Sequence, residues 1–435
     1  MLPYLHGDYM RILVLGAGGF IGRQIVGTLL DAGHRVVGTV RSTDALSAAF
    51  PKAKFIAIDL AKALSAKDWQ CHLADVDVIV NAAGVLRGRD MDAIHFAMPK
   101  ALHTAAKAAS VRRVVLISAI SARSDVSTDY SQSKLAGETE LRSSGLDWII
   151  LRPSLVYGDG SYGGTSLMRG LAGMPLFVPL PGDGEFAFNP IHVQDLARSV
   201  RIVCEEDFVP CKVLEPVGPE TLTVKELLAR YRAWMGFGSA RFLRIPVPVM
   251  RFFGRIGDLT GDGPIATNSL VQMIAGNTGD SEAFVRMIGF APRSLEVALQ
   301  ERPAQVQDRW HARLFFLAPL LQAVLVFMWL MSALVGLSHG GGQTDALVDR
   351  LGLPQGLADP LRIGSCALDI LVAATLVFDR SAVRSALLQL VVVLGYTLVI
   401  GFALPELWFD PLGSLLKNIP IMVAIAIYGI IGDKR

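Results

Sequence analysis

The sequence has few cysteines, and none of them belongs to a motif that binds metal or forms a redox pair. The four residues Cys71, Cys204, Cys211 and Cys366 are scattered over 435 positions, without a CxxC pair or a Cys/His ligand spacing. This arrangement argues against a structural zinc site and against a disulfide framework. We therefore expect no metal, and the cysteine usage fits a reducing compartment such as the cytosol.

Charge is also scarce, but only in one part of the chain. Asp, Glu, Lys and Arg make up 18% of the sequence, below the roughly 25% usual for soluble domains. Only 15 of the 122 residues from Leu314 to Arg435 are charged. The net charge is +2 and no Lys/Arg run is present, which argues against a nucleic-acid partner. The composition indicates a soluble N-terminal part and a membrane-embedded C-terminal part.

No secretory signal is visible at the start of the sequence, because the first apolar run (12–15) breaks into glycines. The hydrophobic pattern begins at Met10. We expect residues 1–9 to be a disordered extension or the product of an over-called start codon.

Strand-like and helix-like patterns alternate through the first 150 residues or so. Apolar β-rich runs lie at 11–15, 35–40, 54–58, 77–81, 113–118 and 147–151, and helical patterns lie near 20–32, 92–109 and 129–144. This alternation predicts an α/β domain over 10–300, with a Rossmann-type doubly wound parallel sheet. Within it, 155–300 should form a small substrate lobe, in which the Gly- and Pro-rich stretch 155–190 is expected to be loops over a cleft.

Four apolar stretches follow a charged hinge at 301–313. They lie at 314–337, 361–378, 386–403 and 418–432, and the first has 24 residues without a charge. At 1.5 Å per residue this is enough to cross ~30 Å of hydrocarbon. We expect an all-α four-helix transmembrane bundle over 314–435.

Asp369 lies near the middle of the second apolar stretch. A charge there is costly and usually faces a bundle interior or a cavity. The alternative is an acid near the membrane interface, if the span is shifted. The candidate partners are Gln322, Gln389, Lys417 and Asn418.

A glycine-rich turn follows the first predicted strand and opens the first predicted helix. Gly16, Gly19 and Gly22 fit the spacing GxxGxxG, with Phe20 and Ile21 between the last two. Such glycines allow a tight turn, a close approach of backbone N–H groups to a pyrophosphate, and close packing of helix on strand. The turn predicts dinucleotide binding.

The ends of the next strands indicate which dinucleotide binds. NAD-binding proteins usually carry Asp or Glu after the second strand, whereas this chain has Arg41, which suits a 2′-phosphate. We expect NADP(H), with NAD(H) as the alternative. A carboxylate after the third strand can accept a hydrogen bond from adenine, and small residues after the fourth let the backbone approach the cofactor. These further cofactor-binding candidates are Asp59, Leu60, Ala82, Ala83 and Gly84.

In combination, these motifs resemble the short-chain dehydrogenase/reductase superfamily, in its extended and atypical, epimerase/dehydratase-like branches. The match covers about 300 residues and includes Asn81-Ala82-Ala83-Gly84, a YxxxK motif, and the segments 151–158 and 189–197. The resemblance implies that Lys134 holds the nicotinamide ribose, and that Pro153 and Ser154 lie beside the carboxamide.

The YxxxK motif places Tyr130 and Lys134 at positions i and i+4, on one face of a helix. A nearby ammonium lowers the pKa of a phenol from ~10, which makes tyrosine a usable acid or base near neutrality. The alternative is an ordinary surface pair. We predict that Tyr130 and Lys134 are catalytic.

The third catalytic member of the family is a Ser or Thr just after the fifth strand, where this chain has Ala119. Ser118 or Ser121 would have to substitute, and we assign the role to Ser118. Otherwise the protein binds NADPH without rapid turnover, as atypical members do.

The last 120 residues or so resemble the DoxX-like four-helix membrane family, through the segment 408–420. Together, the two resemblances predict a membrane-anchored NADP(H)-dependent oxidoreductase acting on a lipophilic carbonyl, alcohol or quinone-like substrate from the lipid phase. One alternative is a non-catalytic NADPH-binding scaffold or assembly factor for a membrane complex, and another is an epimerase or dehydratase.

Cations flanking the apolar stretches predict the topology. One side carries six and the other three, so the nucleotide domain and both termini of this multi-pass protein should face the cytoplasm across the inner membrane. The six are Arg309, Arg313, Arg380, Arg384, Lys434 and Arg435, and the three are Arg350, Arg362 and Lys417.

Overall fold

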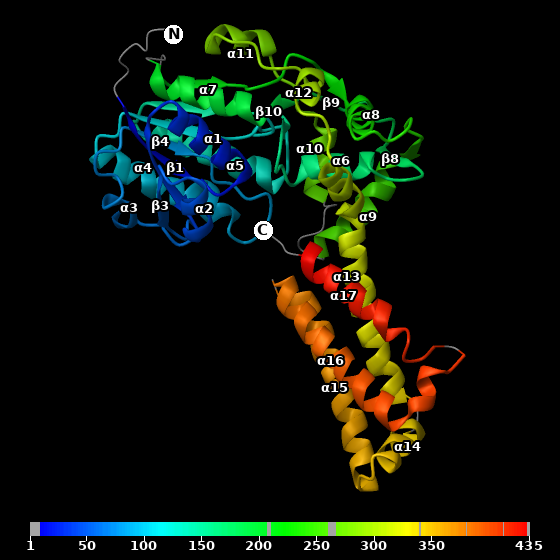
Figure 1. The fold of residues 1–435 in the computed structure, drawn as a ribbon. Coiled ribbons are helices and arrows are strands. Elements are labelled where there is room, and N and C mark those ends of the chain that lie inside the picture. The colour runs from blue at the N-terminus through cyan, green and yellow to red at the C-terminus, as the bar shows by residue number, and fades with distance from the viewer. Residues whose placement is uncertain are drawn as a thin grey trace. The chain divides into compact units, whose positions relative to one another are not determined.

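The computed structural model describes residues 9–206, 210–259, 267–338, 341–379, 381–411 and 413–432. The expectation for residues 1–9 lies outside these ranges except for Tyr9. The chain divides into two compact units, Met1–Ala312 and Arg313–Arg435. The first is an α/β unit and the second is helical (Figure 1).

The α/β unit is built on a parallel sheet of seven strands in the order β11-β6-β5-β4-β1-β2-β3. The order reverses between β1 and β4, which is the point where ligands bind in open sheets of this kind. The predicted Rossmann-type sheet is confirmed. Its strands are β1 (Arg11–Leu15), β2 (Arg35–Val40), β3 (Lys54–Ala57), β4 (Val78–Asn81), β5 (Arg113–Ile117), β6 (Trp148–Leu151) and β11 (Lys212–Leu214).

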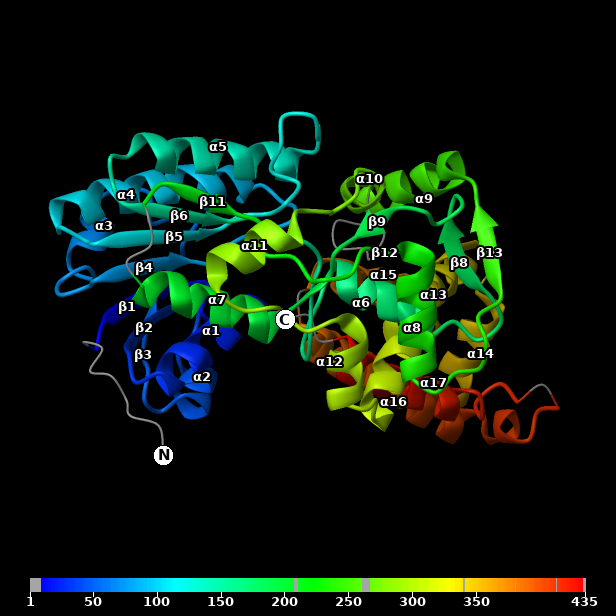
Figure 2. The same cartoon turned by 90° about the horizontal axis from the view of Figure 1, so that it is seen from above.

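Helices cover both faces of this sheet (Figure 2). Alternate residues of β1 point to opposite faces, so Ile12 and Val14 enter one core while Leu13 and Leu15 enter the other. Burial on both sides explains why the strands read as unbroken apolar runs. The first core includes α1 (Phe20–Asp31) and α7 (Val193–Glu205), and the second includes α3 (Lys67–Gln70), α4 (Met98–Ala108) and α5 (Asp129–Ser143); α2 (Asp44–Ala49) follows β2.

The segment 155–300, which was expected to form a substrate lobe, departs from the expectation in one respect. The stretch expected to be loops contains α6 (Gly164–Ala172), in which every residue from Thr165 onward is buried. Gly164 and Gly170 lower the helix propensity of this segment, but packing against α8 decides its structure. Within 155–300, α11 (Ser281–Ile288) packs with α7 on the first core of the sheet. The other elements of this segment, which with α6 we call the lobe, are β7 (Val156–Tyr157), β8 (Val178–Pro181), β9 (Ala187–Phe188), β10 (Ile191–His192), β12 (Leu222–Thr223), α8 (Val224–Trp234), β13 (Phe242–Ile245), α9 (Val247–Leu259), α10 (Thr267–Ile274) and α12 (Leu295–Glu301).

The helical unit contains α14 (Gly342–Arg350), η2 (Gln355–Leu357), α15 (Ala358–Phe378), α16 (Ala382–Ala403), η3 (Pro405–Trp408), α17 (Asn418–Ile431) and most of α13 (Val306–Ser338). Among the described residues, α13, α15 (with η2) and α16 are long and apolar enough to cross a membrane. The 14 residues of α17 are fewer than the roughly 20 that a perpendicular span needs. The prediction of four spans is therefore not confirmed, whereas the all-helical, membrane-type character is.

Candidate active site

The glycine-rich turn between β1 and α1 forms a cradle that side chains would fill. Gly16 has a φ of +70°, and a Cβ atom there would lie 3.0 Å from the backbone of Ala83. A Cβ atom on Gly22 would lie 2.1 Å from the carbonyl oxygen of Gly16. The first turn of α1, all of whose residues the structure describes, contains no acidic residue. The N–H groups at this end of the helix have no partner within the helix, and they favour a bound anion. These residues fit a pyrophosphate.

Phe20 and Ile21 form the start of α1 and are half-buried. The Phe20 ring meets the edge of Tyr162, with ring centres 6.4 Å apart. Tyr162 comes from the loop between β7 and α6 and is 62% exposed. A tyrosine from the substrate lobe therefore lies next to the glycine turn, which the sequence did not indicate.

Arg41 and Asp59 follow the neighbouring strands β2 and β3, and both are exposed. Asp59 pairs with Lys62 at 3.0 Å, and this hydrogen bond holds the pKa of Asp59 below its ordinary value, with Arg41 adding a smaller effect. Leu60 packs against the second core. Arg41, Asp59 and Leu60, which were predicted to bind the adenosine part of the cofactor, therefore all follow the C-terminal ends of the parallel strands β2 and β3.

Ala82, Ala83 and Gly84 follow β4 and meet the side chain of Lys134. The Lys134 ammonium donates to the carbonyl oxygens of Ala83 (3.4 Å) and Ile117 (3.2 Å). A Cβ atom on Gly84 would lie 3.1 Å from Nζ of Lys134. The structure thus brings Lys134 to the ends of β4 and β5, beside the glycine turn.

Tyr130 and Lys134 lie in the first turns of α5, which begins after Thr128, whose hydroxyl accepts the N–H of Ser131 at 3.1 Å. Burial lowers the pKa of Lys134 to about 8 and raises the pKa of Tyr130 to about 12, with Tyr162 adding to the second shift. The expected lowering of the Tyr130 pKa by Lys134 is therefore wrong for this structure. Lys134 directs its ammonium at backbone carbonyls, and burial governs the phenol.

His95 is a site residue that sequence reasoning missed. Its ring centre lies 5.7 Å from that of Tyr130, its Nε2 accepts the N–H of Val85 at 3.2 Å, and its Nδ1 lies 2.8 Å from Oγ of Ser133. Burial, with a smaller effect of Lys134, lowers the pKa of His95 to about 3. A neutral ring that accepts at Nε2 carries its proton on Nδ1 and donates it to Ser133. His95 thereby braces the start of α5.

His95 lies in η1 (Ala93–Ala97), a π-helical turn leading into α4. Such turns occur often at functional sites. The hydrophobic period of the sequence cannot reveal them, because one inserted residue changes it only locally. The signal that the sequence offers for a functional residue here is His95, a histidine between apolar residues.

The hydroxyl predicted to be catalytic is engaged elsewhere. Oγ of Ser118 donates to Oε1 of Glu138 at 2.6 Å, and Glu138 is fully buried. Glu138 also pairs with Arg152 at 2.6 Å and with Arg142 at 3.2 Å. The proton of Ser118 is therefore not directed at a substrate in this structure, and the partly exposed residue beside it is Ala119.

Ser121 and Ser154 are also buried. Ser154 donates its hydroxyl proton to the carbonyl oxygen of Asn277 at 2.5 Å, and the carbonyl of Pro153 accepts the N–H of Ile120 at 3.0 Å. Pro153 thus links the end of β6 to the chain after β5, and Ser154 links it to the chain between α10 and α11.

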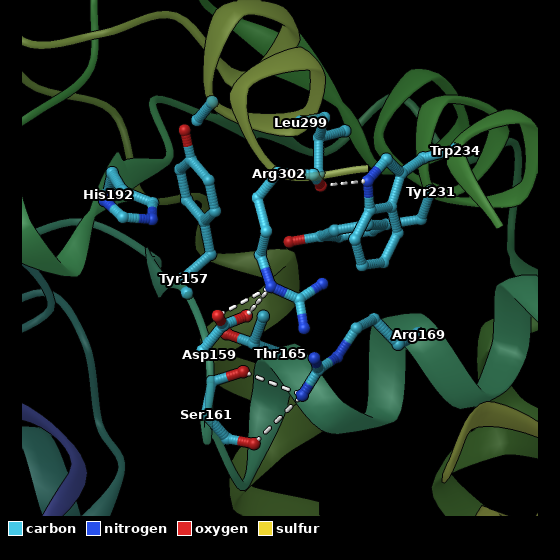
Figure 3. Close-up of a pocket in the computed structure, with 12 residues that line it drawn as sticks. Tyr157, Asp159, Ser161, Thr165, Arg169, His192, Tyr231, Trp234, Leu299 and Arg302 are labelled. Carbon is cyan, nitrogen blue, oxygen red and sulfur yellow. Dashed lines mark hydrogen bonds and ion pairs between the residues drawn. The ribbon is translucent and has the colours of Figure 1, made fainter. Parts of the chain in front are cut away.

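A separate pocket lies within the lobe (Figure 3), and ion pairs and hydrogen bonds cross it. Arg302 bonds to Asp159 at 2.6 Å, and Arg169 bonds to the carbonyl and hydroxyl oxygens of Ser161. Its lining does not include the glycine turn, Tyr130 or Lys134. We assign no chemistry to this pocket.

Within the helical unit, Asp369 is buried, as expected for an acid facing a bundle interior. The predicted partners are wrong: among the described residues, its oxygens accept from Ser332 at 2.6 Å and Tyr396 at 3.3 Å. Three of the predicted partners bond elsewhere, with Gln322 donating to Leu376, Gln389 accepting from Trp329, and Asn418 donating to Thr397. Hydroxyl groups, rather than amides or an ammonium, satisfy this carboxyl group.

Two family models match separate parts of the chain. Residues 16–172 match the NAD(P)H-binding family model, and residues 326–426 match the DoxX-like family. The chain is 26% identical to the ceramide reductase of Caulobacter vibrioides over 57% of its length and 77% of that protein. It is 25% identical to the mitochondrial NADH dehydrogenase [ubiquinone] 1 alpha subcomplex subunit 9 of Dictyostelium discoideum, over 55% of its length and 67% of that protein.

Solved structures show the same fold. The complex of UDP-glucuronic acid 4-epimerase from Bacillus cereus with UDP-glucuronic acid and NAD superposes with a TM-score of 0.52 at 18% identity, covering 70% of this chain and 99% of the epimerase. At this identity the likeness concerns the fold alone.

Proposed function

Because this chain joins an NAD(P)H-binding domain of the epimerase/dehydratase-like type to a DoxX-like membrane domain, we propose that it is a membrane-anchored NADP(H)-dependent oxidoreductase. Its substrate would be a lipophilic carbonyl, alcohol or quinone-like compound. The observation that supports the proposal is the contact of Lys134, one helical turn after Tyr130, with the chain segment after β4 that packs against the glycine turn. The similarity to a ceramide reductase supports a lipid-phase substrate.

Each residue of the site has one proposed role. The glycines of the turn and the start of α1 would hold the pyrophosphate, Arg41 the 2′-phosphate, Asp59 the adenine, and Lys134 the ribose. NADPH, when bound, supplies a hydride. Tyr130 gives a proton to the substrate oxygen, and the raised pKa of its phenol keeps that proton in place at neutral pH, which suits reduction. His95 positions Tyr130 through Ser133, whose hydroxyl donates to the Tyr130 carbonyl at 2.9 Å.

A substrate series tests the proposal directly. Full-length protein in nanodiscs should oxidise NADPH with long-chain ketones or quinones and much more slowly with their short, water-soluble analogues. Equal rates with both series would remove the lipid-phase substrate from the proposal.

Cofactor preference should follow from Arg41. A charge-assisted bond from its guanidinium to the 2′-phosphate should favour NADPH over NADH by about ten- to a hundredfold, corresponding to ~1.5–3 kcal/mol. Titration of the full-length protein with both cofactors measures the ratio. Arg41→Ala should lower it, whereas Lys54→Ala, exposed at the first position of β3 and so at the opposite end of the strands, should leave it unchanged. A wild-type preference for NADH would contradict the assignment.

Cofactor affinity should also depend on pH through Lys134. Burial lowers the pKa of its ammonium to about 8, so the side chain is charged below this pH and neutral above it. The affinity for NADPH should therefore fall as the pH rises through about 8. Binding titrations from about pH 6.5 to 9.5 measure the step. In Lys134→Met the affinity should be lower throughout and the step absent; a step that persists in this variant belongs to another group.

The proposed topology places both termini in the cytoplasm. Of the cations behind it, Arg380, Lys434 and Arg435 lie outside the described residues. A reporter fused at Asp345 should be on the non-cytoplasmic side and one after Arg435 on the cytoplasmic side. A cytoplasmic reporter at Asp345 contradicts the orientation, and a non-cytoplasmic reporter after Arg435 would mean that α17 does not cross.

A second function is favoured by one observation. Ala119 stands where the family has a hydroxyl, and Glu138 engages Ser118. A protein without that hydroxyl can bind NADPH as a scaffold or assembly factor for a membrane complex, and the similarity to a subunit of a respiratory complex supports this alternative. The epimerase or dehydratase alternative is supported by the fold and by 38% identity over 129 residues to the NAD-dependent epimerase/dehydratase terH of Aspergillus terreus.

A further inference from the structure

A segment at the end of the substrate lobe combines arginines with exposed apolar side chains. Leu243 of β13 and Val249 and Phe252 of α9 are 51%, 43% and 61% exposed. Residues 241–257 contain no Asp or Glu. The arginines of the segment, all exposed, are Arg241, Arg244, Arg251 and Arg255.

Strand pairing extends this surface. β13 lies parallel to β8 (Figure 2), and the Val178 N–H donates to the Arg241 carbonyl at 2.9 Å. Leu176 and Phe177, directly before β8, are 73% and 51% exposed. We call Leu176, Phe177 and residues 241–255 the docking edge.

Helix α9 has one packed side and one exposed side. At Gly254 a Cβ atom would lie 3.2 Å from the backbone nitrogen of Thr267, so this side faces α10. At 100° per residue, Arg251 and Arg255 lie next to each other on the exposed side, and Phe252 and Val249 follow around the helix. A basic stripe therefore borders an apolar stripe.

This pattern is typical of elements that lie in a membrane interface. Their apolar side chains enter the boundary between headgroups and acyl chains, while arginines reach the phosphates. The four arginines of 241–255 complement anionic phospholipids, and the first acidic residue after them is Asp258. The same chain contains apolar helices of membrane-spanning length. A bilayer surface is therefore available to this segment.

We infer that the docking edge binds the surface of an anionic phospholipid bilayer, as a second membrane contact in addition to the spanning helices. The inference is independent of whether the protein turns over a substrate. Exposed apolar patches of this kind also serve as protein interfaces, and a second copy of the chain is the competing occupant that the experiment has to exclude.

Full-length protein in nanodiscs provides the test. The discs contain phosphatidylcholine alone or with about 30 mol% phosphatidylglycerol. In a Cys71→Ser/Cys211→Ser background, which removes the two exposed cysteines, an NBD fluorophore is attached at Leu243→Cys. Its emission should shift to the blue and be quenched by nitroxide-labelled lipids, more strongly in the anionic discs. The same fluorophore at Lys225→Cys, an exposed position of α8 in the same lobe, should retain solvent-like emission.

Charge variants distinguish electrostatic binding to lipid from non-specific hydrophobic adsorption. Arg251→Glu with Arg255→Glu should weaken docking by at least about fivefold per arginine, the factor that ~1 kcal/mol represents, while Arg251→Lys with Arg255→Lys should retain it. A rise in apparent Tm on NADPH addition verifies that each variant is folded. Equal quenching at 243 and 225, or quenching that responds neither to phosphatidylglycerol nor to charge reversal, would overturn the inference. Cross-links between copies that replace lipid quenching would overturn it in favour of self-association.

Discussion

Tyr130→Phe is expected to lower turnover by about 10²–10⁴-fold while leaving the affinity for NADPH unchanged. The substitution removes only the hydroxyl that we propose as the proton donor to the substrate oxygen, and this range is usual for one positioned acid or base. The ring, which contacts His95 edge-on, remains in place. Steady-state NADPH oxidation and a binding titration on the same preparation measure the two quantities. Tyr9→Phe, at an exposed tyrosine in the first described residues, is the matched control and should change neither.

Ala119→Ser sharpens this experiment. It adds a hydroxyl at the partly exposed position where the family carries one, and should raise a slow rate because Ser118 is engaged by Glu138. The two variants together separate the enzyme from the scaffold. If neither Tyr130→Phe nor Ala119→Ser alters the NADPH oxidation rate, Tyr130 has no catalytic role and the scaffold function takes precedence.

Gly22→Ala should abolish measurable NADPH binding. Its Cβ atom would lie 2.1 Å from the Gly16 carbonyl oxygen, so α1 must move away from the turn that forms the anion cradle. We expect a loss of stability of ~1–3 kcal/mol from this overpacking, together with a loss of affinity of at least about a hundredfold. The rise in apparent Tm that NADPH produces in the wild type should disappear.

Gly27→Ala is the control in the same helix. A Cβ atom there would meet only a ring carbon of Phe50 at 3.8 Å, an ordinary contact. Alanine is also the better helix former, so stability should be equal or slightly higher and NADPH binding unchanged. If Gly22→Ala binds NADPH as tightly as Gly27→Ala does, the turn between β1 and α1 does not hold the pyrophosphate.

The sheet could be predicted from sequence because its strands are buried on both faces and separated by helix-length segments. The six predicted strands agree with β1–β6 to within about a residue at each end. The glycine turn could also be predicted from the sequence, since Gly16 adopts a positive φ and Gly22 leaves no room for a Cβ atom. The seventh strand, β11, lay inside the stretch taken as substrate lobe, because a run of only three residues carries no period.

The parts that failed depend on contacts between distant residues. Neither the engagement of Ser118 by Glu138 nor the hydroxyl partners of Asp369 follow from spacing, because each joins different elements. The pKa of Tyr130 moved opposite to the expectation for the same reason: sequence places Lys134 one turn away but does not show where its ammonium points. Helix α6 formed in spite of its glycines, through packing that a local pattern does not contain.

The π-helical turn at His95 has a consequence for how this site tolerates insertions and deletions. A Cβ atom on Gly137 of α5 would lie 2.2 Å from the His95 carbonyl oxygen, so the two helices touch at this turn, one turn along from Lys134. Deleting one residue from 93–97 should restore a regular helix and rotate the helical residues before the deletion, from Met91 on, by about 100° relative to α4. His95 would then leave Val85 and Ser133 while α4 and the sheet stayed intact. A single-codon deletion here would therefore separate folding of the unit from assembly of the site.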